Sequence, residues 1–167
     1  MQLRFLADIK VFSIILLTCL IIFLPTIFKP FLCDDYKVMY RIINGQSIYS
    51  KDFFRPLSDL SLYLCYQVAG LNSIVFNIFN LIIHSLNCFI LYSFCRKSSL
   101  FDFQQRKFIA ITSSLLFLVY PFHNESIVWI VGLGSNLSSF FGFLALIILF
   151  SGIHSTWKYI LVSFLYF

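Results

Sequence analysis

Apolar segments without a charged residue recur along the chain and limit the folds that it can adopt. The first runs over residues 11–28, and its 18 residues can cross most of a hydrocarbon core about 30 Å thick. Hydrophobic residues make up 60% of the 167-residue chain, and a water-soluble domain of that composition would expose large apolar patches. Similar segments follow at residues 74–94, 108–122, 126–153 and 159–167. The sequence therefore predicts an integral membrane protein of the all-α class.

The number and length of these segments predict how the chain is organised. We expect a polytopic helical bundle of about four complete transmembrane helices and a truncated fifth, because residues 159–167 are too few to cross a bilayer. Residues 1–167 would then form a single transmembrane domain, the amino-terminal fragment of a larger core. Residues 29–73 form the first outer loop, in which the apolar periodicity of residues 40–43 and 57–69 predicts short interfacial helices.

Basic residues mark one side of the predicted bundle. Arg96, Lys97, Arg106 and Lys107 lie in the loop between the second and third spans, where only Asp102 opposes them. Together with the basic amino terminus, this loop is expected in the cytoplasm, and we expect a bacterial inner membrane rather than endoplasmic reticulum. The net charge of +5 is then a consequence of topology, and no nucleic acid partner is expected.

Acidic residues gather in the loops of the opposite side. Asp34 and Asp35 follow the first span, and Glu125 lies beside His123 in the turn after the third span. Because the first and third spans cross in the same direction, both loops reach one face. The carboxyl end of a helix disfavours nearby carboxylates, which supports a functional role for the aspartate pair. A solvated loop with lysines as partners is the alternative.

Carboxylates in this position suit two kinds of chemistry. They can deprotonate an acceptor hydroxyl group, or they can hold a divalent cation through oxygen ligands, and His123 can assist either function. Asp34 and Glu125 are the possible metal ligands. The sequence assigns no cofactor with certainty, and it leaves a divalent cation open.

Arg55 is the strongest anion-binding candidate of the first outer loop. Its guanidinium group can grip a phosphate through two hydrogen bonds, and Lys51 and Arg41 are weaker candidates. A structural ion pair with Asp52 or Asp59 explains Arg55 equally well.

The second span carries a stripe of polar side chains. Asn77, Asn80, His84 and Asn87 are spaced so that, at about 100° per residue, they fall within roughly 80° of one another on a helix. Such groups are unfavourable in lipid, so we expect the stripe to face the bundle interior. Interhelical hydrogen bonding is favoured over a direct role in chemistry. A transporter could use the stripe as an aqueous path, but the spans contain no charged residue.

The order of these motifs resembles the amino-terminal part of membrane glycosyltransferases of the GT-C superfamily. The closest resemblance is to O-mannosyltransferase-like proteins, many of which carry tetratricopeptide repeats, and it covers nearly the whole chain. Each motif is short, and only their combination is specific. The motifs are Asp34-Asp35, Phe54-Arg55-Pro56-Leu57, Asn80-x-x-x-His84 and Pro121-x-His123-x-Glu125, followed by Trp129 and Gly132.

The resemblance implies an inverting transfer of a sugar from a polyprenyl-phosphate donor on the extracytoplasmic face of the bilayer. It implies that one aspartate of the first outer loop acts as general base. We assign this catalytic role to Asp34, with Asp35 as its partner or a substrate ligand, and the spacing alone does not distinguish the two adjacent residues. His123 and Glu125 would bind the acceptor, the donor phosphate or a metal, and Arg55 would lie near the donor phosphate. The motifs do not define the sugar, or whether the acceptor is a glycan, a protein or a lipid.

Two positions depart from the family pattern. Relatives often carry an arginine after the glycine that Gly132 matches and an aspartate two residues further, where this chain has Leu133 and Ser135. This departure, together with the small number of spans, leaves a non-catalytic or truncated membrane protein as the main alternative. A transporter segment is a further alternative that the sequence favours less.

Overall fold

The described part of the chain is helical throughout. The computed structural model describes residues 2–46, 55–98, 100–121, 124–150 and 156–166, and it contains no strand within these ranges. The all-α class is therefore confirmed. The elements in chain order are α1 (Gln2–Ile22), α2 (Leu24–Ile27), α3 (Cys33–Ile43), α4 (Pro56–Ala69), α5 (Ser73–Lys97), α6 (Arg106–Val119), α7 (Asn124–Val128), the 3-10 turn η3 (Ile130–Gly132), α8 (Leu133–Leu149) and α9 (Thr156–Tyr166).

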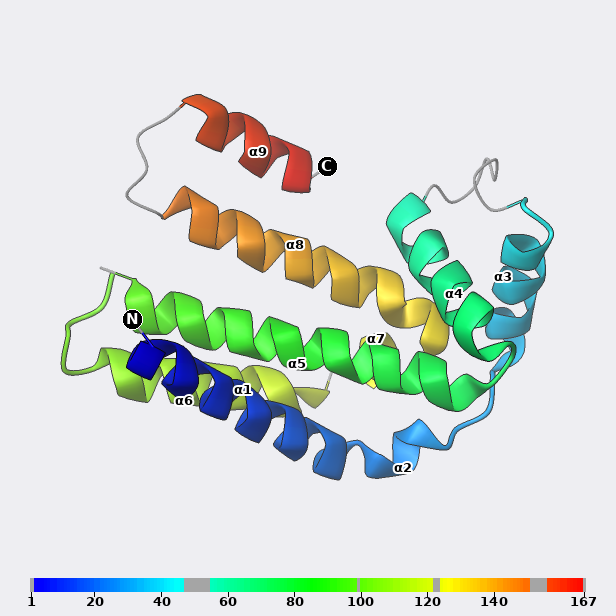
Figure 1. Ribbon diagram of the computed structural model, residues 1–167, viewed down its shortest axis with the longest axis horizontal. Helices are drawn as coiled ribbons and strands as arrows, with labels where there is room; N and C mark the ends of the chain where they lie inside the picture. The colour runs from blue at the N-terminus through cyan, green and yellow to red at the C-terminus, as the bar shows by residue number, and fades with distance from the viewer. Residues whose placement is uncertain (1, 47–54, 99, 122–123, 151–155, 167) are drawn as a thin grey trace.

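Helix α5 is the central element of the bundle. It packs against α1, α6 and α8 (Figure 1). Its 25 residues begin after Asn72, whose side-chain oxygen accepts a hydrogen bond from the Ile74 amide, and they end with Arg96 and Lys97, whose charges suit the carboxyl end of a helix. Helices α3 and α4 lie at one end of the bundle, and the turn from α5 to α6 lies at the other (Figure 1).

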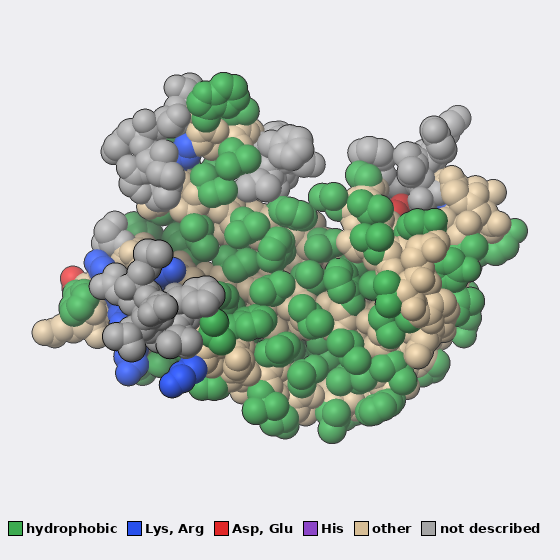
Figure 2. Space-filling model, in the orientation of Figure 1, with side chains coloured by type: hydrophobic (Ala, Val, Ile, Leu, Met, Phe, Trp, Pro, Cys, Tyr) green, Lys and Arg blue, Asp and Glu red, His purple; other side chains and the backbone are tan. Residues whose placement is uncertain are grey.

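Two helices are long and apolar enough to cross a membrane within the described ranges. They are residues 73–97 in α5 and residues 130–149 across η3 and α8, and α1 adds a shorter apolar stretch at residues 9–22. Helix α6 has 14 residues and α9 has 11. Four complete spans and a truncated fifth therefore stay a prediction. Hydrophobic side chains cover most of the visible bundle face (Figure 2), a surface that suits lipid contact better than water.

The first predicted span, residues 11–28, is interrupted near its end. Helix α1 stops at Ile22, and α2 continues from Leu24 after a break at Phe23. Pro25 explains the break, because proline has no N–H to donate to the carbonyl of the preceding turn and is accommodated at the first positions of a new helix.

Amides of the α5 polar stripe bond to the ends of two short helices. All four stripe residues are buried. The Nδ2 of Asn77 donates to the carbonyl of Ile27, the last residue of α2, at 3.1 Å. The Nδ2 of Asn80 donates to the carbonyls of Ser126 and Ile127 in α7, at 2.8 and 2.9 Å. These carbonyls lie in the last turns of their helices, where no intrahelical partner is available. The stripe therefore fixes both outer loops to α5.

The two stripe residues nearer the carboxyl end of α5, His84 and Asn87, connect α5 to α6 and α8. His84 Nε2 lies 3.3 Å from the carbonyl oxygen of Leu118, in the last turn of α6. Asn87 Nδ2 donates to Asn136 Oδ1 at 2.7 Å, and Asn136 Nδ2 donates to Asn80 Oδ1 at 2.7 Å. The stripe therefore makes interhelical hydrogen bonds through the bundle interior, which is the function expected of amides in an apolar bundle.

The first helix of the outer loop starts at residue 33, earlier than residue 40, where the apolar pattern predicts it to start. Helix α3 starts at Cys33, so Asp34 and Asp35 lie in its first turn. The expected position near the carboxyl end of a helix is therefore wrong, because a new helix begins there and the two carboxylates meet its favourable positive end. Helix α4 runs over residues 56–69, close to the predicted 57–69, and Gly70 follows with a φ of 60° that favours glycine.

Replacing Gly132 with alanine should destabilise the protein. A Cβ atom at this position would lie 2.5 Å from the carbonyl oxygen of Glu125, and overpacking of this kind costs about 1–3 kcal/mol. We expect a lower midpoint of thermal unfolding in detergent, followed by circular dichroism. Gly142→Ala in α8 is the matched control, because beyond the nearby backbone of its own helix the added methyl group meets no atom within 4 Å. Equal midpoints for both variants would contradict the close approach at Gly132.

Candidate functional site

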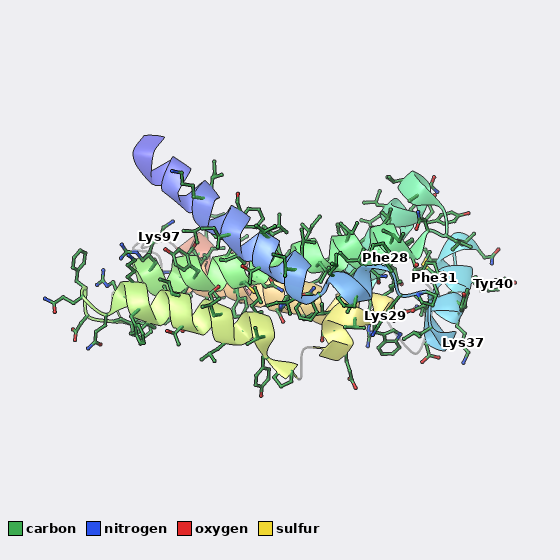
Figure 3. All side chains as sticks on the ribbon, turned by 90° about the horizontal axis from the view of Figure 1, so that it is seen from below. Phe28, Lys29, Phe31, Lys37, Tyr40 and Lys97 are labelled. Atoms are coloured by element: carbon green, nitrogen blue, oxygen red, sulfur yellow. The ribbon has the colours of Figure 1, made fainter. Side chains whose placement is uncertain are left out.

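A cleft of about 510 Å³ opens at the end of the bundle where α3 and α4 meet α7, η3 and the start of α8. Figure 3 shows Lys37 of α3 near this end and Lys97 of α5 near the other. The cleft is highly charged, since three acidic and three basic side chains line it. They are Asp34, Lys37, Arg41, Arg55, Asp59 and Glu125.

Three residues singled out in the sequence meet in this cleft. Asp34 comes from α3, Arg55 directly precedes α4, and Glu125 comes from α7. His123 lies outside the described residues. Asp35 is not among the residues that line the cleft. The structure therefore brings together one member of the aspartate pair, the predicted anion-binding arginine and the acid of the second outer loop.

Asp34 is accessible from solvent. Its side chain is 58% exposed, and Lys37 Nζ lies 3.6 Å from its Oδ1 one turn further along α3. An exposed ion pair of this kind contributes little to stability because water screens it. Asp34 can therefore exchange Lys37 for a ligand, and its carboxylate can accept a proton from a bound hydroxyl group.

Asp35 is buried and its two carboxylate oxygens are both engaged. Oδ2 accepts the Leu32 amide at 2.8 Å, and Oδ1 accepts the Val131 amide at 3.1 Å. Burial raises the pKa of Asp35 above its ordinary value, although hydrogen bonds from Leu32, Val131 and the Trp129 side chain favour its ionised form. Asp35 caps the start of α3 and ties it to η3, so Asp34 is the member of the pair that can reach a ligand.

Arg41 and Asp59 form an ion pair between α3 and α4 in the wall of the cleft. Arg41 Nη2 lies 3.8 Å from Asp59 Oδ1, and the Asp59 side chain is 7% exposed. Burial raises the pKa of Asp59, and the positive charges of Arg41 and Arg55 oppose that shift. The sequence pointed to Arg41 only as a weak candidate, and it left Asp59 as a structural partner of Arg55.

The residue spacing in α3 predicts which face of this helix lines the cleft, and the apolar pattern alone did not reveal it. Asp34, Lys37, Val38 and Arg41 line the cleft, and their spacing of 3, 4 and 7 residues from Asp34 places them on one face of a helix. The predicted helix of residues 40–43 was too short to show this face. Lys37 is therefore a further site residue that the sequence analysis missed.

Arg55 extends across the start of α8. A Cβ atom added to Gly134 would lie 3.8 Å from Arg55 Nη1 and 3.6 Å from Ser58 Oγ. These distances are ordinary van der Waals contacts, so Arg55 lies beside the start of α8 without requiring a glycine at position 134. The position of Arg55 is compatible with an anion in the cleft.

The described residues contain no group of three or more His, Cys, Asp or Glu side chains that could hold a metal ion. Asp34 and Glu125 line the same cleft, but two carboxylates are fewer than the six or more oxygen ligands typical of a calcium site, and magnesium completes its shell with water and substrate oxygens. A divalent cation therefore stays a prediction.

Comparison with known proteins finds that part of this chain is similar to proteins named O-mannosyl-transferases. No family model and no solved structure matches the chain. It is similar to protein O-mannosyl-transferase F38B6.6 of Caenorhabditis elegans, at 27% identity over 71% of this chain and 20% of the relative. Protein O-mannosyl-transferase TMTC1 of Mus musculus is 37% identical over 47% of this chain and 8% of its own length. Protein O-mannosyl-transferase TMTC3 of Homo sapiens is 34% identical over 53% of this chain and 9% of its own length.

The chain spans a fifth or less of the length of these curated relatives. The similarity is distant and partial, and it supports a glycosyltransferase-like relation. The resemblance to O-mannosyltransferase-like proteins is confirmed to this extent. Assignment to the GT-C superfamily, the lipid-linked donor and the roles of single residues stay predictions.

Replacing Asp35 with asparagine should destabilise the fold. Asp35 accepts hydrogen bonds from two backbone amides, and asparagine has only one side-chain oxygen to accept them. Its NH₂ group would face the N–H group of the other amide, and the lost hydrogen bond lowers the free energy of unfolding by about 1–3 kcal/mol. The midpoint of thermal unfolding in detergent measures this effect. Asp34→Asn is the control, since that side chain is exposed and should leave the midpoint nearly unchanged. Equal shifts in the two variants would contradict the structural role of Asp35.

Proposed function

We propose that the chain is the amino-terminal part of a membrane glycosyltransferase of GT-C type. It transfers a sugar from a polyprenyl-phosphate donor to an acceptor on the extracytoplasmic face, with inversion at the anomeric carbon. The observation that carries the proposal is the cleft that collects Asp34, Arg55 and Glu125 from three separate segments. The O-mannosyl-transferase relatives support the same class of reaction.

Asp34 is the general base of the proposed reaction. Its exposed carboxylate takes the proton of the acceptor hydroxyl group while the acceptor oxygen attacks the anomeric carbon. The bond between that carbon and the phosphate oxygen breaks, and its electron pair leaves with the lipid phosphate. Asp34 lies in a cleft that also holds three basic side chains, so the base and the groups that stabilise the leaving phosphate share one site.

Arg55 binds the donor phosphate in this proposal. A guanidinium group forms two parallel hydrogen bonds to phosphate oxygens and stabilises the negative charge of the leaving group. Glu125, with His123, binds the acceptor or the donor. Leu133 is buried in the hydrophobic core, so the position where relatives often carry arginine makes no donor contact in this chain. Ser135 lines the cleft and can bind a hydroxyl group.

The bilayer supplies the lipid-linked donor to this site. We propose that α1 and α6, which lie beside α5, cross the membrane with α5 and α8, and that the amino terminus is cytoplasmic. The basic side chains at the turn from α5 to α6 lie at the far end of the bundle from the cleft (Figures 1 and 3), as the positive-inside rule requires for an extracytoplasmic cleft. The named relatives are animal proteins, which favours the endoplasmic reticulum over the bacterial inner membrane expected from the sequence.

Asp34→Asn should abolish sugar transfer without unfolding the protein. Removing a general base typically slows a reaction by about 10²–10⁴-fold. The measurement is transfer of a radiolabelled sugar from a polyprenyl-phosphate donor by the intact gene product in membranes, beside the unfolding midpoint of the purified chain.

Asp102→Asn is the matched control, because it removes an exposed carboxylate outside the cleft. It should transfer sugar at the wild-type rate. Wild-type activity of Asp34→Asn would rule out Asp34 as the base, and an inactive wild type with every donor tested would favour the non-catalytic alternative.

A further inference from the structure

A buried carboxylate in the wall of the cleft pairs with one guanidinium group and is acted on by the charge of a second. Asp59 lies in the first turn of α4 and is buried. Arg41 of α3 forms its ion pair at 3.8 Å, and the positive charge of Arg55 also acts on it. All three residues line the cleft. One carboxylate is thus shared by two cations that come from different segments of the first outer loop.

The pair of Arg41 and Asp59 is not arranged for stability alone. Arg41 Nε and Asp59 Oδ2 are buried, and neither has a hydrogen-bond partner among the described residues. A buried polar atom without a partner costs about 1–3 kcal/mol, and a buried ion pair of loose geometry returns little of its desolvation energy. A ligand that offers acceptor atoms to Arg41 would improve this arrangement.

The charge of the group indicates the chemistry of that ligand. Two guanidinium groups and one carboxylate have a net charge of +1, and guanidinium groups match the oxygens of a phosphate. The phosphodiester of a lipid-linked sugar has a single negative charge. Asp59 attracts both cations, which would otherwise repel each other, and this attraction favours their presence in the same wall of the cleft.

We propose that Asp59 is a positioning residue that holds Arg41 and Arg55 on one wall of the cleft, so that both guanidinium groups bind the phosphate of a lipid-linked sugar. The identity of this phosphate compound rests on the proposed function. The inference adds Arg41 to the groups that bind the phosphate and gives Asp59 a role that acts through the two arginines.

The direction in which Asp59→Asn changes the affinity for a phosphate distinguishes a positioning role of Asp59 from a purely electrostatic one. If Asp59 acts only as a negative charge, Asp59→Asn removes repulsion and tightens anion binding. If Asp59 positions the arginines, the same variant weakens binding, and we expect the Kd for farnesyl phosphate to rise about tenfold. The ligand is titrated against the detergent-purified chain. Asp102→Asn removes the same charge away from the cleft and should leave the Kd unchanged.

The variant Arg41→Lys provides a second test, because lysine keeps the positive charge but cannot form the two parallel hydrogen bonds of a guanidinium group. It should weaken binding of farnesyl phosphate, and adding Asp59→Asn should then have a smaller effect than in the wild type, because both changes act on one contact. Unfolding midpoints show whether each variant is folded. If Asp59→Asn does not fold, the Arg41→Lys result decides.

Three results would overturn the positioning role: tighter or unchanged binding by Asp59→Asn, an unchanged Kd for Arg41→Lys, or no binding of farnesyl phosphate by the wild type. Sugar transfer by the intact gene product is measured separately. Binding that depends on Asp59 without transfer from any polyprenyl-phosphate donor refutes the proposed function and leaves the positioning role intact. Transfer with an unchanged KM for the donor in Asp59→Asn refutes the positioning role alone.

Discussion

Hydrogen bonds from the α5 amides to helix-end carbonyls hold the two outer loops in place. A helix that ends in an apolar bundle leaves carbonyl groups without partners, and water is not available to satisfy them. Asn77 serves the end of α2 and Asn80 serves the end of α7. The chain enters the first outer loop after α2, and α7 itself contributes Glu125 to the cleft. The cleft therefore depends on two side chains that do not line it.

A second connection joins the loops to each other. Asp35 accepts amides from Leu32, before α3, and from Val131 in η3. The first outer segment and the segment after α7 are thus linked both through α5 and directly. Gly132 permits the close contact of η3 with α7 that this arrangement needs. The presence of Asp34 and Glu125 in the same cleft follows from these backbone connections, and not from an attraction between two carboxylates.

Much of the fold was predictable because apolar length and polar spacing are properties of the sequence alone. The spacing of the stripe from Asn77 to Asn87 indicated an inward face, and the alternation of spans indicated that Asp34 and Glu125 would reach the same end. The start of α3 was not predictable from apolar periodicity, because carboxylates in the first turn begin this helix. The pairing of Arg41 with Asp59 joins residues from two helices whose packing the sequence does not encode locally, so it became visible only in the structure.

The reliance on amide donors makes the bundle sensitive to a change that preserves shape. Asn80 donates to three carbonyl oxygens, those of Ser126, Ile127 and Trp129, and aspartate has nearly the same size but no N–H groups in its ionised side chain. A substitution table based on volume would rate Asn80→Asp as conservative. In this protein the substitution would place a negatively charged carboxylate oxygen against these three carbonyl oxygens. The polarity of the side chain at position 80, rather than its size, therefore sets which sequences can form this bundle.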